Sequence, residues 1–301
     1  MKKLTFISTF LLLAAIAVHA RQNDSRKLTG PYLGQTPPVN EPVLFAPGIV
    51  SNGDNASSAA FGPDGKEIYW DVGYKIRFTK LENGRWTEPE IVPFCKGDSY
   101  IYTNPFVAPD GKKMFFTSTR SGAVSQDKEN IWYAERTSSG WSDPKPVSPE
   151  VNAMTLHWSI SVSDSGTLYF QGAREDSFGG IGDIYYSKLV NGAHARPVNV
   201  GPQLNTKATE TCPYVAPDES YIVFTRFDQT DPKNSGIFIS YRGKSDQWLP
   251  AVMLRGGSRD RGGLSPRISP DGKYLFYVNG GMFWMSAGLV EELRPKELKS
   301  E

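Results

Sequence analysis

The stretch PFVAPDGKKMFFTSTR, residues 105–120, is written five times along the chain with small changes. The other four copies are AAFGPDGKEIYWDVG, SISVSDSGTLYFQGAR, PYVAPDESYIVFTRF and PRISPDGKYLFYVNG. Their acidic turn residues follow one another at steps of 46, 54, 54 and 53 residues: Asp64, Asp110, Asp164, Asp218 and Asp271. Self-similarity at such a period indicates a repeat architecture.

Each copy supplies the first two strands of a four-stranded antiparallel unit. In the second copy, TNPFVA (103–108) is extended, and Pro109, Asp110 and Gly111 have the chemistry of a tight turn. KMFFTSTR (113–120) is the second strand and NIWYAERT (130–137) is the third. WSDPKPVS (141–148) is the fourth, and its prolines fit an outer edge, where a missing N–H is tolerated.

One such sheet cannot bury both of its faces, whereas several sheets stacked around an axis can. Trp86, Trp141 and Trp248 recur in one register, which predicts that they pack between neighbouring units. His194 lies near that register in the third unit, and we expect the same packing role for it. The sequence therefore predicts an all-β fold, a five-bladed β-propeller of four-stranded antiparallel blades, with six blades as the alternative count.

The fifth unit has no fourth strand of its own. The segment PVLFAPGIVS (42–51) matches the fourth strands of other units, such as PEIVPF and PKPVSPE. We expect residues 43–50 to pair with the strand near residues 282–287, because this pairing closes the ring and removes an open edge.

The two ends of the chain are expected to be short segments outside the repeats. Residues 1–20 have the basic start, the short apolar run and the small-residue cleavage site of a signal peptide. The residue directly after that site is Arg21 and not a cysteine, so a lipoprotein anchor is not expected, and no later segment is apolar enough to span a membrane. Residues 21–42 are an extended leader, 43–290 a single propeller and 291–301 a charged tail. The expected location is periplasmic or secreted, as a monomer.

Composition excludes some partners. The net charge of +1 gives no basic face for nucleic acid. Cys95 and Cys212 fall at different places in their repeats, so they are either two partly buried thiols or a long-range disulfide. Neither belongs to a C-x-x-C pair, and we expect no metal and no cofactor.

The phrase P-x-x-S/A-P-D-G-K-x-x-F, followed by IYYS or IWYAER, resembles the repeat of TolB-like propeller proteins. The repeats cover nearly all residues from Pro42 to Val290. TolB-like propellers usually have six blades and a separate N-terminal domain, whereas this chain has five units and a short leader. The resemblance implies the fold, and it is nearly silent about function.

The loops divide into two sets at the two ends of the ring. We call the end with the five Asp turns the PD rim and the opposite end the irregular rim, because its loops are long and varied. Variable loops on a regular scaffold usually carry function. The irregular loops are CKGDSYIYTN (95–104), RSGAVSQDKEN (120–130), AREDSFGGIGD (173–183), RFDQTDPKNSG (226–236) and RGGSRDRGG (255–263).

Aligning the inner strands predicts the residues around the central mouth. His157 and Trp158 are placed in register with Thr103 and Asn104, while Tyr102 and Glu210 lie one step earlier. Trp158 is either a platform for stacking on a sugar ring or a plug that fills a narrow channel. The predicted ligand-binding residues are Trp158, His157, Arg174, Glu210, Arg120, Arg226, Tyr102 and Asn104.

Three arginines recur after the second strands, at Arg120, Arg174 and Arg226. Their guanidinium groups are suited to a carboxylate or sulfate, or else they belong to the loop architecture. No motif fixes a catalytic residue. The weak candidates are Glu210, Asp183 and His157.

Two functions therefore remain open at this stage. The first is an exported binding module that takes a glycan or an envelope or protein partner at the irregular rim. The alternative is a carbohydrate-active enzyme, a glycoside hydrolase or lyase acting on an anionic polysaccharide, in which paired carboxylates would flank the bond.

Overall fold

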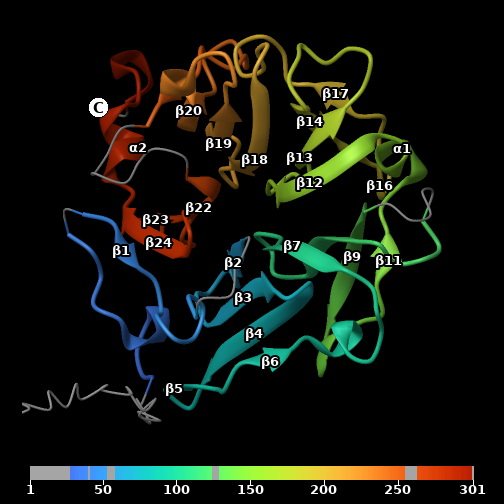
Figure 1. Cartoon of the computed structure of the whole chain (residues 1–301), viewed down its shortest axis with the longest axis vertical. Helices are drawn as coiled ribbons and strands as arrows, with labels where there is room; N and C mark the ends of the chain where they lie inside the picture. The colour runs from blue at the N-terminus through green and yellow to red at the C-terminus, as the bar shows by residue number, and fades with distance from the viewer. Residues whose placement is uncertain (1–27, 40, 53–57, 124–128, 255–262, 300–301) are drawn as a thin grey trace, which may run out of the picture.

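The computed structural model describes residues 28–39, 41–52, 58–123, 129–254 and 263–299, with the backbone alone at residues 156 and 157. In these ranges, five small antiparallel sheets are arranged around a central axis (Figure 1). The chain is thus an all-β, five-bladed propeller, as the repeats predict, and the alternative count of six blades is wrong. The predicted signal peptide, residues 1–20, lies outside the described residues.

The blades follow one another in chain order. Blade 1 contains β2 (Ala59–Phe61), β3 (Glu67–Val72), β4 (Lys75–Glu82), β5 (Arg85–Trp86) and β6 (Glu90–Ile91). Blade 2 contains β7 (Tyr102–Val107), β8 (Lys113–Ser118), β9 (Asn130–Thr137), β10 (Gly140–Trp141) and β11 (Lys145–Pro146). Blade 3 contains β12 (Thr155–Val162), β13 (Leu168–Ala173), β14 (Asp183–Ser187) and β17 (Val198–Asn199), with a hairpin of β15 (Leu189–Val190) and β16 (Ala193–His194).

Blade 4 contains β18 (Thr209–Val215), β19 (Tyr221–Phe227), β20 (Gly236–Tyr241) and β21 (Val252–Met253). Blade 5 contains β22 (Leu264–Ile268), β23 (Tyr274–Val278), β24 (Met282–Ser286) and β1 (Val43–Leu44). The short helices between them are η1 (Tyr32–Gly34), η2 (Pro93–Cys95), α1 (Pro149–Asn152), η3 (Pro232–Asn234), α2 (Gly288–Glu292) and η4 (Lys296–Leu298).

The expected fourth strand of the first two blades is broken into two pieces. In blade 2, β10 and β11 both pair with β9, and in blade 1, β5 and β6 both pair with β4. Pro144 and Pro89 stand between the two pieces. Because proline has no N–H to donate to the ladder, the outer strand is interrupted there.

Each PD turn is closed by a backbone hydrogen bond across three residues, as from Gly111 N–H to the Ala108 carbonyl at 2.8 Å. In the third blade the same bond joins Gly166 to Ser163. Asp164 therefore aligns with Pro109, and Ser165 has the place of Asp110. The expected alignment of the third repeat is wrong by one residue, because its turn reads S-D-S-G where three others read x-P-D-G and the fourth blade reads A-P-D-E.

The strand pairing shows that the same one-residue shift applies to the residues at the irregular rim. Trp158 pairs with Gln171 as Thr103 pairs with Thr117, so Trp158 is the equivalent of Thr103 and not of Asn104. After each of these residues the inner strand has a β-bulge. The bulge residues have left-handed backbone with φ between 51° and 53°: Asn104, Ser159, Cys212 and Ser265. Such bulges bend a strand and redirect its side chains.

Trp141 and Trp248 pack neighbouring blades against one another, as predicted, whereas Trp86 Nε1 donates to the Gly30 carbonyl of the leader at 2.8 Å. The Trp141 Nε1 group donates to the Tyr69 hydroxyl of blade 1 at 3.1 Å, and the Trp248 ring packs edge-on against Tyr169 of blade 3. His194 has the same role, since its ring packs against Phe115 of blade 2 and its Nε2 lies 3.2 Å from the Gly166 carbonyl.

The N-terminal segment closes the ring. Val43 and Leu44 of β1 pair with Trp284 and Phe283 of β24, and the Phe45 N–H adds a bond to the Met282 carbonyl at 2.7 Å. The predicted closure is confirmed, although the regular pairing is shorter than residues 43–50. The described part of the leader also packs on the ring: the Tyr32 hydroxyl donates to Asp271 at 2.8 Å.

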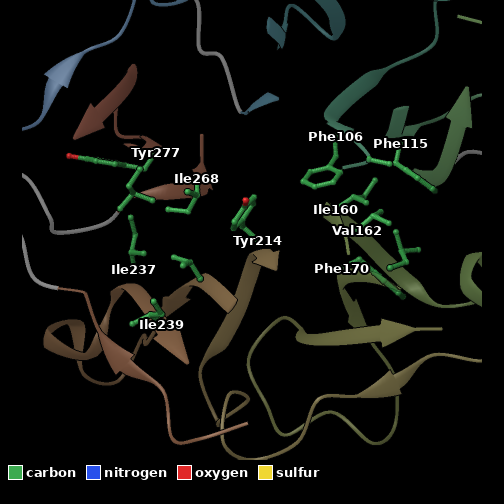
Figure 2. Close-up of a cluster of buried hydrophobic side chains, with 14 of the residues drawn as sticks. Phe106, Phe115, Ile160, Val162, Phe170, Tyr214, Ile237, Ile239, Ile268 and Tyr277 are labelled. Atoms are coloured by element: carbon green, nitrogen blue, oxygen red, sulfur yellow. The ribbon is translucent and has the colours of Figure 1, made fainter. Parts of the chain in front are cut away.

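The largest apolar cluster runs through blades 2 to 5. It joins residues of the inner strands, such as Phe106, Ile160, Tyr214 and Ile268, with residues of the second and third strands (Figure 2). The inner strands therefore provide both the core and the lining of the channel. Their two ends form the two rims at which a ligand would bind.

Candidate functional site

At the irregular rim, the bulge residues of four inner strands approach one another across the channel. The Ser159 hydroxyl donates to Asn104 Oδ1 at 3.4 Å and to Cys212 Sγ at 3.1 Å. Ser265 donates to the same sulfur at 3.5 Å. The left-handed backbone turns these small polar side chains toward the axis, and together they narrow the channel just inside the irregular rim.

Trp158 lies at this mouth as an exposed and anchored aromatic side chain. It is 42% exposed, which is too much for a plug inside a narrow channel. Its Nε1 group donates to Glu129 Oε2 at 2.7 Å, and Glu129 Oε1 accepts from the Thr103 hydroxyl at 3.2 Å. The indole is therefore held by a hydrogen bond while a large part of its surface faces solvent. Of the two hypotheses for Trp158, the geometry favours the platform.

Further polar groups surround the platform. The Thr103 and Thr117 hydroxyls are 2.7 Å apart, and Asn104 Nδ2 donates to both at 3.3 Å. Between blades 3 and 4, the Thr211 hydroxyl donates to Gln171 Oε1. The sequence reasoning missed Glu129, Thr117 and Gln171. The strand pairing would have identified the last two, because they lie opposite Thr103 and Trp158 on the second strands.

Tyr102 and Arg120 belong to a network beside this mouth. Tyr102 is buried, and its hydroxyl donates to Asp98 Oδ2 at 2.6 Å and accepts from Arg120 Nη1 at 3.1 Å. Lys75 Nζ binds the same carboxylate at 2.9 Å. Partial burial alone would raise the pKa of Asp98, but the bonds from Tyr102 and Lys75 outweigh it and lower the pKa. The network positions the loop that leads to β7.

Glu210 and Arg226 do not face the rim. Glu210 is fully buried and accepts from Arg226 Nε at 2.7 Å and from the backbone and hydroxyl of Thr206. Arg226 also donates to the Leu204 carbonyl. The buried pair ties the loop before β18 to β19, so neither side chain is open to a ligand. Arg226 lies inside β19, two residues earlier in register than Arg120 and Arg174, so the three arginines do not form one repeated site.

The remaining candidates are not brought together either. Arg174 is paired with Asp176 at 2.5 Å and donates to the Pro197 carbonyl. Asp183 is fully buried, and burial raises its pKa despite bonds from the Phe178 N–H and from Asn199. The backbone of His157 aligns with Tyr102, and its side chain lies outside the described part of the chain.

The two cysteines are buried free thiols, which decides between the two alternatives. Burial raises the pKa of Cys95 to about 12, so it is unreactive at neutral pH. Within the described residues, no three His, Cys, Asp or Glu side chains are grouped as metal ligands. The same residues include no helix with the length and apolar composition that a membrane crossing requires.

No family model matches the chain, and no curated protein matches it. Solved structures are similar in fold. For TolB from Acinetobacter baumannii the identity is 18%, the match covers 78% of this chain and 52% of that chain, and the TM-score is 0.52. For an alpha-L-arabinofuranosidase from Lactobacillus brevis the values are 13%, 80%, 92% and 0.53. For a nidogen/laminin complex they are 13%, 79%, 78% and 0.50.

The chain has the fold of a TolB-like β-propeller. It spans about half the length of the Acinetobacter TolB chain. Identities this low show the fold alone, and one propeller fold serves binding proteins and enzymes alike. The function must therefore be argued from the side chains at the rims.

Proposed function

We propose that this chain is an exported, monomeric and non-catalytic binding propeller that holds an oligosaccharide at the irregular rim, against the indole of Trp158. The observation that carries this proposal is the combination of exposure and anchoring in one aromatic side chain. Trp158 is 42% exposed, yet its Nε1 group is fixed on Glu129. A preformed platform loses little conformational entropy when a ligand stacks on it.

The surroundings of the platform suit a sugar. The apolar face of a pyranose ring stacks on an aromatic side chain, while the ring hydroxyls need donors and acceptors nearby. Thr103, Asn104 and Glu129 offer both kinds of group beside Trp158. The site is an open face at the mouth of the channel, which suits an extended chain of sugars better than a single small molecule.

The enzyme alternative receives less support. Glycoside hydrolysis needs two carboxyl groups, about 5–10 Å apart, that reach the glycosidic bond. Glu210 and Asp183 are both fully buried, and Glu210 is neutralised by Arg226. Among the described residues, Glu129 is the carboxylate that contacts the platform, and it is occupied in holding the indole. A binding role does not require Glu210, Asp183 or Glu129 to give up the hydrogen bonds that it makes in this structure.

A protein partner at the same rim is the second candidate function. Three further exposed apolar side chains lie on loops of this rim: Tyr74 at 64%, Phe178 at 45% and Ile181 at 56%. Exposed aromatic residues are common at protein interfaces. The propeller in the nidogen/laminin complex shows that the fold can occur in a protein assembly, which says nothing specific about this chain.

The test is a glycan screen on the chain without residues 1–20, followed by titration of the strongest hit. Trp158→Ala should weaken binding at least about thirtyfold, because an aromatic platform carries most of the desolvated contact. Phe178→Ala is the matched control, since it removes an exposed aromatic of the same rim away from the channel mouth. Its affinity for the glycan should be unchanged.

Other outcomes would change the proposal. If Trp158→Ala is folded and binds the glycan normally, the site lies elsewhere. If no glycan binds and Phe178→Ala abolishes a protein interaction, the protein-partner function replaces it. Release of shortened glycans, detected by mass spectrometry, would show that the chain is an enzyme.

A further inference from the structure

A cavity of about 200 Å³ lies at the other end of the channel, inside the PD rim. The inner strands of all five blades line it, through residues such as Ala60, Phe106, Val162, Tyr214 and Ile268. In Figure 2, Tyr214 is seen between Ile268 on one side and Phe106 and Val162 on the other. Prolines of the PD turns, including Pro63 and Pro217, are exposed and lie at the cavity's edge. The cavity therefore has apolar walls and an opening among the turns.

One charged side chain, Arg267, lines this apolar cavity. It is 2% exposed and donates to three backbone carbonyls: Nη1 to Pro213 at 3.2 Å and Pro266 at 3.0 Å, and Nη2 to Ile160 at 3.1 Å. Its Nε–H is buried and has no hydrogen-bond partner within the described residues.

The charge of Arg267 is under-compensated. The other buried arginine described above, Arg226, is paired with Glu210, whereas no ion pair joins Arg267 to a described carboxylate. Asp71 and Cys212 act on it only at longer range, and burial lowers the pKa of Arg267 to about 10. A buried guanidinium is normally paired with a carboxylate or another anion.

Tyr214 adds a second donor to the same wall. Its hydroxyl has no hydrogen-bond partner in the part of the chain that the structure describes, and it is not among the fully enclosed polar atoms, so it can meet a ligand. The wall of the cavity thus combines one guanidinium without a carboxylate partner and one free hydroxyl donor with otherwise apolar side chains.

We propose that this cavity binds a small apolar carboxylate, whose anionic group is held by the guanidinium of Arg267 and the hydroxyl of Tyr214. The apolar walls favour a ligand with a hydrocarbon or aromatic body, and the guanidinium requires a negative head. Inorganic phosphate has the charge but no apolar part to bury. A neutral apolar molecule would leave the guanidinium unpaired. This site is separate from the glycan platform, which lies at the opposite end of the channel.

The experiment is calorimetric titration of the chain without residues 1–20 with benzoate, and with benzamide as its neutral counterpart of the same shape. Benzoate should bind and raise the melting temperature by mass action, and benzamide should bind at least about tenfold more weakly. Binding of both with equal affinity, or of neither, would overturn the proposal.

Two variants assign the donors. Arg267→Met keeps a long apolar side chain and removes the charge, so benzoate affinity should fall at least tenfold while Trp158-dependent glycan binding is unchanged. Replacement of a buried charge by an apolar residue is often tolerated. If this variant does not fold, Tyr214→Phe decides, because it removes one hydroxyl and almost no volume. An unchanged affinity for benzoate in Tyr214→Phe would then contradict the site.

The source of the carboxylate is distinguished by one more titration. N-acetyl-phenylalanine carries the same chemistry on a peptide end, and its amide lacks the charge. Binding of the acid but not the amide would show that the cavity takes a chain terminus. Binding of benzoate alone would indicate a free organic acid, and either result supports the proposal.

Discussion

Glu219 stands in the fourth PD turn where other turns have glycine. Its backbone is left-handed, with φ of 59°, a conformation that costs a residue with a side chain about 1–2 kcal/mol. The carboxylate offsets this cost by accepting from Ser163, Tyr169 and Arg242 at 2.7–2.8 Å. Partial burial would raise the pKa of Glu219, but these hydrogen bonds lower it overall. A local strain is thus coupled to the contact between blades 3 and 4.

A pair of substitutions separates the strain from the hydrogen bonds. Glu219→Ala loses the bonds and keeps the strain, so it should lower the free energy of unfolding by about 2–3 kcal/mol. Glu219→Gly loses the same bonds but relieves the strain, and should be about 1 kcal/mol more stable than the alanine variant. Urea denaturation measures both, and equal stability of the two variants would refute the account.

The pH dependence follows from the direction of the Glu219 shift. Because its pKa is lower in the folded protein than in the unfolded chain, the stabilisation is present above the unfolded glutamate pKa. It is lost as the pH falls through the folded pKa. The free energies of unfolding of Glu219→Gln and the wild type should therefore converge as the pH falls below the unfolded glutamate pKa, and a constant difference at all pH values would contradict this.

Neighbouring blades are joined by the tryptophans that recur at one position of the repeat. Trp141 of blade 2 donates to the Tyr69 hydroxyl of blade 1. Arg136 is stacked 4.0 Å over the Trp141 ring and donates to Glu67, which is also in blade 1. In blade 4, Arg242 lies 4.1 Å over Trp248 and donates to Glu219 of its own blade and to Tyr169 of blade 3. Blade 3 has His194 in this place, which makes one of the blade contacts titratable.

His194 should make the contact between blades 2 and 3 sensitive to acid. Burial lowers its pKa, and Lys113 adds to the effect. Above the ordinary histidine pKa the ring is neutral in both states and nothing is lost. As the pH falls below that value, the unfolded chain binds a proton that the folded protein resists, so stability decreases. The stability difference between His194→Gln and the wild type should then depend on pH between 7.5 and 5.5, and a constant difference would exclude this role.

The sequence predicts elements well where hydrophobic pattern and turn chemistry agree. Five repeats, the closing strand and the packing role of Trp141 and His194 all follow from it. It fails at the third turn, which is one residue shorter than the others between Ser163 and Thr167, because the side-chain period of a strand is two and a shift of one changes the face. It also could not show that Glu210 is paired with Arg226, since that contact depends on how β18 lies beside β19.

At the scale of the whole molecule, the chain is held closed by its N-terminal segment. Phe45 is fully buried, and its ring lies 5.0 Å from Phe276 and 5.3 Å from Trp284. A chain that begins at residue 51 should aggregate or lose much of its thermal stability, because the edge of β24 is exposed. A chain that begins at residue 28 is the control and should melt like the longer protein. A truncated chain that stays monomeric with an unchanged melting temperature would refute ring closure.

The ring of polar side chains around Cys212 separates the two ends of the channel. The glycan platform lies on one side and the Arg267 cavity on the other. We therefore expect a glycan and benzoate to bind together without competition. The inner strands contribute to both sites: Trp158, Thr103 and Asn104 lie at their irregular-rim ends, and Tyr214 and Arg267 lie toward the PD rim.

The most direct test of the central proposal is the position of the ligand on the irregular rim. The chain has seven tryptophans, and each indole N–H gives a separate signal in a nitrogen–proton correlation spectrum. Titration with the glycan hit should shift the Trp158 signal, assigned by its absence in Trp158→Phe, and leave those of buried residues such as Trp70 and Trp284 in place. A bound glycan that leaves the Trp158 signal unmoved would contradict the proposed function.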